Sequence, residues 1–343
     1  MKTTRVAIRS GICFLLVGVG FFAARKEGAK AAQVQPRNFV LIAHGGAGDY
    51  SQLSPAQLAA KTAAMTEAIR SGYNILAQGR SSLDAVEATI RSLENSGDFD
   101  AGRGAYYARD GVPELDAAIM DGKTLNAGAV AAVKRIANPV SLARMVMEKT
   151  PHVLLVGDGA EEFAKSQGVA VVSPYYFYNE AEWKRYQEMK SKEDKNKSGR
   201  LADSAIYGTV GVVALDQAGN LAAGTSTGGT TWKMPGRVGD SPLIGAGTYA
   251  NNDSCGISAT GVGEYFIRNV VAADICARVR YLHVSLQQAA NDVVMGELVA
   301  QHGEGGIIGI DRQGQIADVF NSNGMMRGVV RLDGKIAIKV SKE

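Results

Sequence analysis

The arrangement of apolar and polar residues predicts a strand and then two helices near the start of the chain. Residues 38–50, NFVLIAHGGAGDY, form an apolar run that ends in a glycine-rich turn, as expected of a strand that enters a loop. In residues 54–79 and 81–97, apolar positions recur at helical spacing. A serine stands at the start of each of these two segments, where its hydroxyl can cap the free amides of a first helical turn.

Farther along the chain, strand patterns and helix patterns alternate. Asp-Gly pairs at 110–111 and 121–122 punctuate the strand-like stretch 104–136 and predict hairpin turns. Further helices are expected at 138–151, 158–168, 263–280 and 284–301, and further strands at 152–157, 209–227 with a turn at 217–220, 256–261, and 306–320 as a closing hairpin.

One internal segment, residues 184–205, is highly charged and poor in large apolar residues. This composition predicts an exposed, mobile tether, although the first half equally fits the solvated end of a helix. The segment leads directly into the apolar strand that is expected from residue 209.

The N-terminus has the pattern of an export signal. Lys2, Arg5 and Arg9 precede an apolar run, and the small residues of AKA at 29–31 provide a cleavage site. The alternative is an uncleaved anchor, but the apolar run is shorter than the roughly 20 residues that span a bilayer. We therefore expect an exported protein, periplasmic or secreted. Without residues 1–31 the formal charge of +3 becomes −2, which offers no electrostatic basis for binding nucleic acid.

The cysteines leave the redox compartment open. Cys13 lies within the export signal, so only Cys255 and Cys276 would remain in the mature chain. They can pair or stay as buried thiols. Buried thiols are favoured because 343 residues with 46% hydrophobic content can form an ample core without a disulfide.

Several kinds of site are excluded by the sequence. The four histidines are scattered and no Cys-x-x-Cys pair occurs, so no zinc site is expected. His44 and His152 each border an apolar strand, where a structural role is expected. The chain also lacks a phosphate-binding Gly-x-x-x-x-Gly-Lys loop and a Gly-x-Ser-x-Gly nucleophile turn.

Thr209 is a candidate nucleophile because of where it stands. It follows Gly208 at the point where the charged segment becomes an apolar strand. Cleavage of the Gly208–Thr209 bond would free an α-amine with an ordinary pKa of about 7.7–8.0, which could act as the base for the threonine's own hydroxyl. Taken alone, the same residues also describe an ordinary strand threonine after a bend.

Nearby residues strengthen this hypothesis. Thr227 lies on the expected partner strand and could orient the nucleophile. In the turn 235–242, Arg237 and Asp240 could bind the carboxylate and the ammonium of an α-amino acid, although a salt-bridged surface turn has the same pattern.

A third group of candidates lies in residues 258–266. There Thr260, Gly261 and Gly263 end a strand before a helix, which suits stabilisation of an oxyanion. The alternative is a helix N-terminus with glycine hinges.

In combination, six segments closely resemble the plant-type L-asparaginase and isoaspartyl peptidase family of N-terminal nucleophile (Ntn) hydrolases. They are HGGAG, ELDAAIMDGKTLNAGAVAAV, NPVSLARMVM, GTVGVVALDQAGNLAAGTSTGG, PGRVGDSPLIGAGTYANN and ATGVGEYFIR. The resemblance covers nearly all of residues 38–330. It implies an α+β fold, a four-layer αββα sandwich of the Ntn-hydrolase type. It also implies a precursor that cleaves itself within one composite domain: an export signal at 1–31, an α chain at 32–208 with a flexible tail from about 184, and a β chain at 209–343. Such proteins usually assemble as dimers of αβ heterodimers.

The resemblance also assigns roles to residues. Gly208 and Thr209 flank the bond that is cleaved, Thr209 becomes the catalytic nucleophile, and Thr227 assists it. Thr260 and Gly261 match the oxyanion-binding positions. The residues that match the substrate-binding positions are Arg237, Val238, Gly239, Asp240, Thr260, Gly261, Val262 and Gly263.

The implied reaction is hydrolysis of asparagine or of β-aspartyl (isoaspartyl) dipeptides to aspartate. No organic cofactor is implied, but relatives often hold a structural sodium ion by backbone carbonyls, here near residues 92–104. One departure is Asp100, where many relatives have asparagine; a carboxylate there could alter substrate preference or the pH of self-cleavage.

Two alternative functions remain. A glycosylasparaginase typically has His-Asp before its threonine, and a non-catalytic module on this fold would stay a single chain.

Overall fold

The computed structural model describes residues 38–195 and 206–342, and these residues belong to one compact unit. The helices are α1 (Pro55–Ala77), α2 (Ser82–Ser96), α3 (Pro139–Lys149), α4 (Gly157–Ser166), α5 (Glu180–Lys195), α6 (Gly263–Asn269), α7 (Val271–Ala277) and α8 (Leu286–Asn291). The strands are β1 (Val40–Gly48), β2 (Leu115–Asp121), β3 (Ala127–Val133), β4 (Leu154–Val156), β5 (Ile206–Tyr207), β6 (Val210–Leu215), β7 (Leu221–Thr227), β8 (Thr248–Ala250), β9 (Cys255–Gly261), β10 (Gly305–Asp311), β11 (Ile316–Phe320), β12 (Gly324–Arg331) and β13 (Ile336–Lys339).

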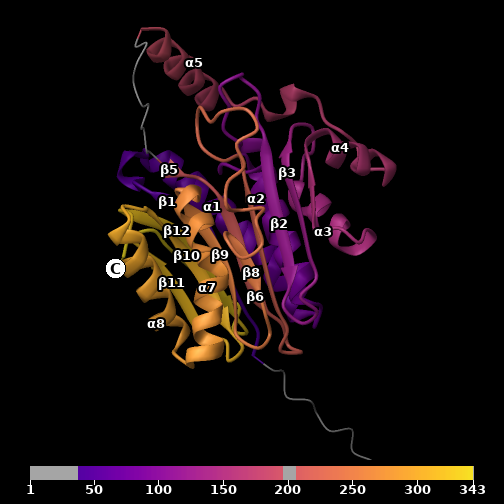
Figure 1. Ribbon diagram of the computed structural model, residues 1–343, viewed down its shortest axis with the longest axis vertical. Helices are drawn as coiled ribbons and strands as arrows, with labels where there is room; N and C mark the ends of the chain where they lie inside the picture. The colour runs from indigo at the N-terminus through magenta and orange to yellow at the C-terminus, as the bar shows by residue number, and fades with distance from the viewer. Residues whose placement is uncertain (1–37, 196–205, 343) are drawn as a thin grey trace, which may run out of the picture. The chain divides into compact units, whose positions relative to one another are not determined.

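Within the described residues the strands form two sheets (Figure 1). The larger sheet has the order β13-β12-β1-β6-β7-β2-β3-β4, with β5 paired to one end of β1. The smaller sheet has the order β11-β10-β9-β8. The pair β3–β4 is parallel, and the other neighbours in both sheets run antiparallel.

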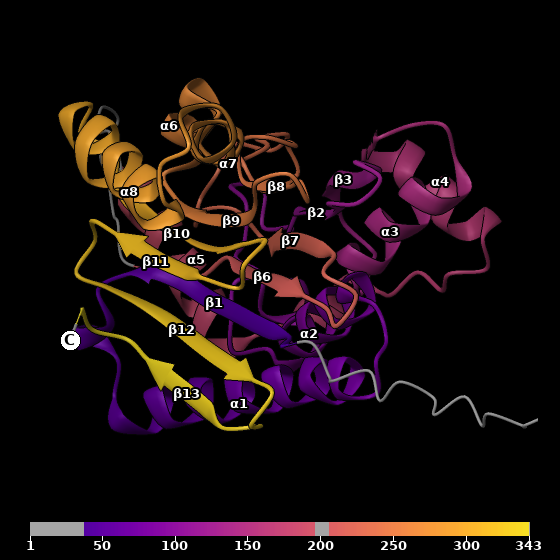
Figure 2. The same ribbon diagram turned by 90° about the horizontal axis from the view of Figure 1, so that it is seen from below.

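Three buried clusters show that these elements form four layers. The first joins the larger sheet to α1, α2, α3 and α4, the second joins the smaller sheet to α6, α7 and α8, and the third lies between the two sheets. Figure 2 shows the same order, with α1 and α2 beneath the larger sheet and α6, α7 and α8 above the smaller one. The predicted α+β fold with αββα layers is therefore confirmed.

Local sequence explains the two long helices. Ser54 caps α1 and forms a reciprocal capping box with Gln57, while Ser81 caps α2 by accepting the amide hydrogen of Asp84. The helix α2 ends at Gly97, which adopts the left-handed conformation that favours glycine. A methyl carbon placed on Gly224 of β7 would lie 2.8 Å from Ile90, so glycine allows α2 to lie close to the sheet.

The segment from 184 differs from the prediction. Residues 184–195 belong to α5, and Tyr186 and Met189 of this helix are buried against Tyr107 and Trp232. This aromatic packing fixes the helix despite its charged composition. The rest of the predicted tether, residues 196–205, lies outside the described residues.

Two strand predictions also need correction. The Asp110–Gly111 pair forms a turn in a loop and joins no hairpin, whereas the turn after Asp121 does join β2 to β3. The hairpin β10–β11 is confirmed but does not close the fold. The chain continues into β12 and β13, and β12 pairs with β1 inside the larger sheet.

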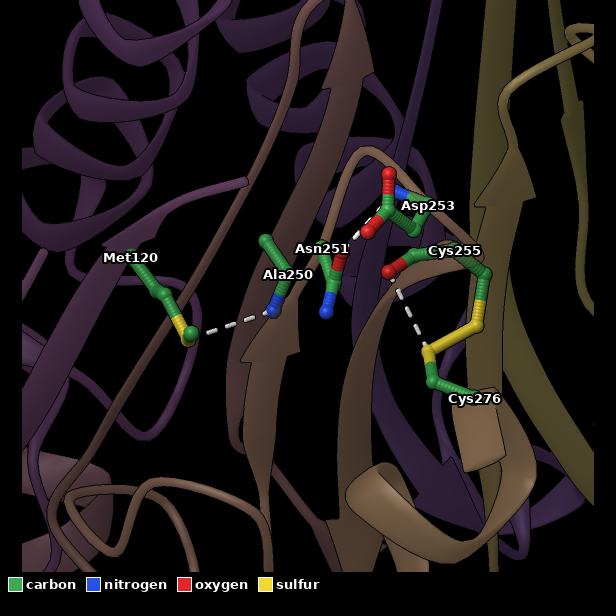
Figure 3. Close-up of a disulfide and its surroundings, with 6 residues drawn as sticks. All are labelled: Met120, Ala250, Asn251, Asp253, Cys255 and Cys276. Atoms are coloured by element: carbon green, nitrogen blue, oxygen red, sulfur yellow. Dashed lines mark hydrogen bonds between the residues drawn. A yellow bond between two sulfur atoms is a disulfide. The ribbon is translucent and has the colours of Figure 1, made fainter. Parts of the chain in front are cut away.

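Cys255 and Cys276 form a disulfide, so buried free thiols, the favoured interpretation, are wrong. The bond joins the start of β9 to α7, with 5.4 Å between the two Cα atoms (Figure 3). No helix among the described residues is long and apolar enough to cross a membrane. The predicted export signal lies outside the described residues, so the structure does not test it.

Candidate active site

Thr209 and Thr227 lie side by side where β6 begins and β7 ends. The two hydroxyl oxygens are 2.8 Å apart, and both side chains are buried. The antiparallel pairing of Val210 with Ser226 produces this arrangement. The Gly229 amide donates to the hydroxyl oxygen of Thr227 at 2.9 Å, which leaves the Thr227 hydrogen available to Thr209. The structure thus provides a hydrogen-bonded threonine beside the Gly208–Thr209 bond.

The carbonyl of Gly208 is held by Asp100. The Asp100 amide donates to this carbonyl oxygen at 3.0 Å, and the Asp100 carbonyl accepts from the Gly228 amide at 3.0 Å. A methyl carbon on Gly208 would lie 2.6 Å from Cβ of Asp100. Gly208 does not have a left-handed φ. Close approach to Asp100 therefore requires glycine here.

The smaller sheet brings the predicted oxyanion residues toward Thr209. A methyl carbon on Gly211 would lie 1.9 Å from the hydroxyl of Ser258, and one on Gly256 would lie 2.7 Å from Val213. These contacts align β6 and β9 in opposite directions, so the end of β9 that carries Thr260 lies toward the end of β6 that follows Thr209.

Gly261 closes that end of β9. It has a φ of +148°, and a methyl carbon there would lie 2.4 Å from the carbonyl oxygen of Glu304. Val262 follows as the N-cap residue of α6, and its amide donates to the same carbonyl at 2.9 Å. The backbone between β9 and α6 therefore has little conformational freedom.

The predicted headgroup residues converge on Gly263. A methyl carbon on Gly263 would lie 2.8 Å from Oδ1 of Asp240 and 3.1 Å from Nη2 of Arg237. Arg237 binds both carboxylate oxygens of Glu264, at 3.0 and 3.1 Å. The Oδ2 atom of Asp240 is buried without a hydrogen-bond partner in the described structure. Burial raises the pKa of Asp240 to about 7, although the Arg237 charge favours the ionised form.

Three buried charged residues near the site do not feature in the sequence prediction. Lys233 donates from Nζ to the Glu114 carbonyl at 2.8 Å, and burial lowers its pKa. The Glu114 carboxylate accepts from the Gly236 amide at 2.7 Å. Asp116, which pairs with Thr227 across β2 and β7, accepts from the Gly239 amide at 3.4 Å.

The turn that contains Arg237, Val238 and Gly239 is held against β2 by these contacts. A lysine flanked by Trp232 and Met234 is the one sequence signal that could have revealed this group. No group of three or more His, Cys, Asp or Glu side chains in the described part of the chain could hold a metal ion.

Known proteins resemble this chain over most of its length. The family model described as Asparaginase matches residues 37–339. The chain belongs to this asparaginase family. An isoaspartyl peptidase of Salmonella typhimurium is 49% identical over 293 residues, covering 84% of this chain and 94% of that protein. An isoaspartyl peptidase/L-asparaginase of Bos taurus is 41% identical, covering 87% and 95%. A plant-type L-asparaginase of Pyrobaculum calidifontis is 42% identical, covering 84% and 95%.

In this member of the asparaginase family, His44 has a structural role, as expected. It is fully buried, its Nε2 lies 3.0 Å from the Ser258 hydroxyl, and burial lowers its pKa to about 3. The network continues from Ser258 to Thr225 and from Thr225 to Thr248, each over 2.7 Å. His44 is therefore neutral and joins the two sheets behind the nucleophile. His152, in contrast, is exposed.

Proposed function

We propose that this protein is a self-processing hydrolase that releases aspartate from β-aspartyl peptides and from asparagine. The observation that carries the proposal is the 2.8 Å contact between the hydroxyls of Thr209 and Thr227 beside a carbonyl held by the Asp100 amide. The family membership and the names of the relatives support the same reaction.

Self-cleavage is an acyl shift from nitrogen to oxygen. The Thr209 hydroxyl attacks the Gly208 carbonyl carbon, whose oxygen already accepts from the Asp100 amide at 3.0 Å. The carbon–nitrogen bond breaks, and the proton of the hydroxyl passes to the departing nitrogen. Water then hydrolyses the ester, which leaves a Gly208 carboxylate and a free Thr209 amine.

Hydrolysis of the substrate uses this new amine as the base. Arg237 and Asp240 bind the α-carboxylate and the α-ammonium, which places the side-chain carbonyl near Thr209. The hydroxyl attacks this carbonyl, and Thr260 and Gly261 stabilise the oxyanion. The amine transfers its proton to the leaving nitrogen, and water hydrolyses the β-aspartyl ester.

Three further features belong to this proposal. Export is supported by the Cys255–Cys276 disulfide, because disulfides persist in oxidising compartments. A sodium ion near 92–104 rests on the family resemblance alone. The mature form is a dimer of αβ heterodimers, on the family resemblance alone.

The test is the intact mass of the purified protein under denaturing conditions, compared with a Thr209→Ala variant. We expect two fragments from the natural chain, the smaller beginning at Thr209, and an uncut variant without activity toward asparagine or β-aspartyl-leucine. Thr231→Ala serves as a matched control because it removes a nearby threonine hydroxyl that has no hydrogen-bond partner in the described structure. A natural chain that stays whole after prolonged incubation would contradict the proposal.

A further inference from the structure

A cavity of about 300 Å³ lies beside the loop that approaches Gly208. It is enclosed by α1, by the loop 97–106 and by the start of α5. Its wall includes Asp100 and Tyr106, which also approach Gly208. A methyl carbon on Gly208 would lie 2.6 Å from Cβ of Asp100 and 3.1 Å from the Tyr106 hydroxyl. The cavity and Gly208 therefore share two neighbours, Asp100 and Tyr106.

Two carboxyl groups in this cavity have buried oxygens without a hydrogen-bond partner in the described structure. They are Oδ2 of Asp100 and Oε2 of Glu182. The other oxygen of Asp100 accepts from the Tyr106 amide at 2.7 Å. Buried polar atoms normally have a hydrogen-bond partner, so these two unpartnered oxygens suggest that a donor is missing. Asp240 has the same feature in the headgroup site, where the substrate ammonium would supply the donor.

The cavity also contains two cationic side chains. The Lys61 ammonium donates to the Asp98 carbonyl and lies 4.8 Å from the centre of the Phe99 ring. The Arg185 guanidinium lies 5.3 Å from the centre of the Tyr106 ring. Both interact electrostatically with Glu182. Two cations beside two unpartnered carboxyl oxygens suit a ligand that carries both a carboxylate and an N–H group.

The position of the Thr209 nitrogen indicates which part of the substrate would enter this cavity. Before self-cleavage the nitrogen of Thr209 is bonded to Gly208, so this nitrogen faces the Gly208 side. A departing nitrogen must come within hydrogen-bond distance of the same amine to receive its proton. The leaving group therefore lies on the Gly208 side of Thr209, where Asp100 and Tyr106 form part of the cavity wall.

We propose that this cavity binds the amino acid released from β-aspartyl dipeptides, with its α-carboxylate held by Arg185 and Lys61 and its scissile N–H facing Oδ2 of Asp100. This inference rests on the proposed function and makes it specific. Asparagine releases ammonia, which is too small to reach these cations, so the cavity distinguishes dipeptides from asparagine.

The test compares three substrates: β-aspartyl-leucine, β-aspartyl-leucinamide, which lacks the terminal carboxylate, and asparagine. We expect the natural protein to favour the dipeptide over its amide by about 10- to 100-fold in kcat/KM, mostly through KM, as for a hydrogen bond to a charged group. Arg185→Gln should remove this preference and leave the amide and asparagine within about twofold. Arg185→Lys should keep part of it.

Lys190→Gln is the matched control, because it removes an exposed positive charge from the same helix outside the cavity. Self-cleavage of each variant, read by intact mass, verifies folding. An unchanged ratio of dipeptide to amide in Arg185→Gln, with the natural protein active, would overturn the inference alone. A natural protein that releases aspartate from none of the substrates would overturn the proposed function and this inference with it.

Discussion

The two sides of Thr209 are built differently. On the headgroup side, Arg237 and Asp240 come from one short turn and meet at Gly263. On the cavity side, Lys61, Asp100 and Arg185 come from a helix, a loop and a second helix far apart in the chain. Both sides contain a buried carboxyl oxygen without a partner in the described structure.

In the proposed reaction, this difference would separate the binding of the constant headgroup of the substrate from the binding of its variable leaving group. Asparagine and β-aspartyl peptides share the same α-amino acid headgroup, so one compact turn can bind both. Their leaving groups differ in size and charge, and the cavity formed by separate elements can change without disturbing the turn.

The largest expected effect is that of Arg237→Gln. Loss of the guanidinium leaves the substrate carboxylate without its charged partner, which typically costs about 2–5 kcal/mol, or roughly 30- to several-thousand-fold in kcat/KM. We expect equal losses for asparagine and β-aspartyl-leucine, because both present the same headgroup, and normal self-cleavage by intact mass. A loss confined to the dipeptide would mean that Arg237 binds the leaving group and not the shared headgroup.

An intermediate effect is expected from Gly208→Ala. The added methyl would lie 2.6 Å from Cβ of Asp100 and 2.8 Å from its amide nitrogen. Overpacking of this kind typically costs about 1–3 kcal/mol, so self-cleavage should slow about ten- to a hundredfold. Once cleaved, the enzyme has the same Thr209 terminus and should hydrolyse asparagine at the normal rate. Gly159→Ala, where the methyl meets nothing within 4 Å, provides the control.

The smallest effect is a pH dependence of stability. Burial raises the pKa of Asp240 from 3.8 to about 7, so the folded state binds its proton more tightly than the unfolded state. This contribution to stability is complete below pH 4 and is lost as the pH rises to 7, with a slope of at most about 1.4 kcal/mol per pH unit.

We expect Asp240→Asn to flatten this decline in urea unfolding between pH 5 and 8, measured in the uncut Thr209→Ala background. The decline should not vanish, because burial also raises the pKa of Glu94 and of Asp100 to about 7. An identical slope in both proteins would mean that Asp240 is already ionised when folded.

The same comparison explains how much could be predicted from sequence. The nucleophile, the turn with Arg237 and Asp240, and the strand end at Thr260 lie in short local motifs, and local motifs can be recognised. The cavity could not be predicted, because the charged composition of α5 conceals the packing of Tyr186 and Met189 against Tyr107 and Trp232. Only the spacing of Trp183, Tyr186 and Met189 at every third position hinted at a buried helix face.

The strand β12 was missed for a related reason. It is eight residues long, but it follows a hairpin, and its place beside β1 depends on contacts across almost the whole chain. The disulfide likewise depends on the distance between two elements and cannot be derived from a count of cysteines.

The order of strands in the larger sheet has a consequence for the cleaved protein. β1 precedes the proposed cut, yet it lies between β12 and β6, which both follow it, and β7 pairs with β2 in the same way. The two fragments would therefore interleave within one sheet and could not separate without breaking rows of backbone hydrogen bonds. Before cleavage, refolding is a unimolecular reaction. After cleavage it becomes bimolecular, so a mature protein diluted from denaturant should recover at a rate that depends on its concentration.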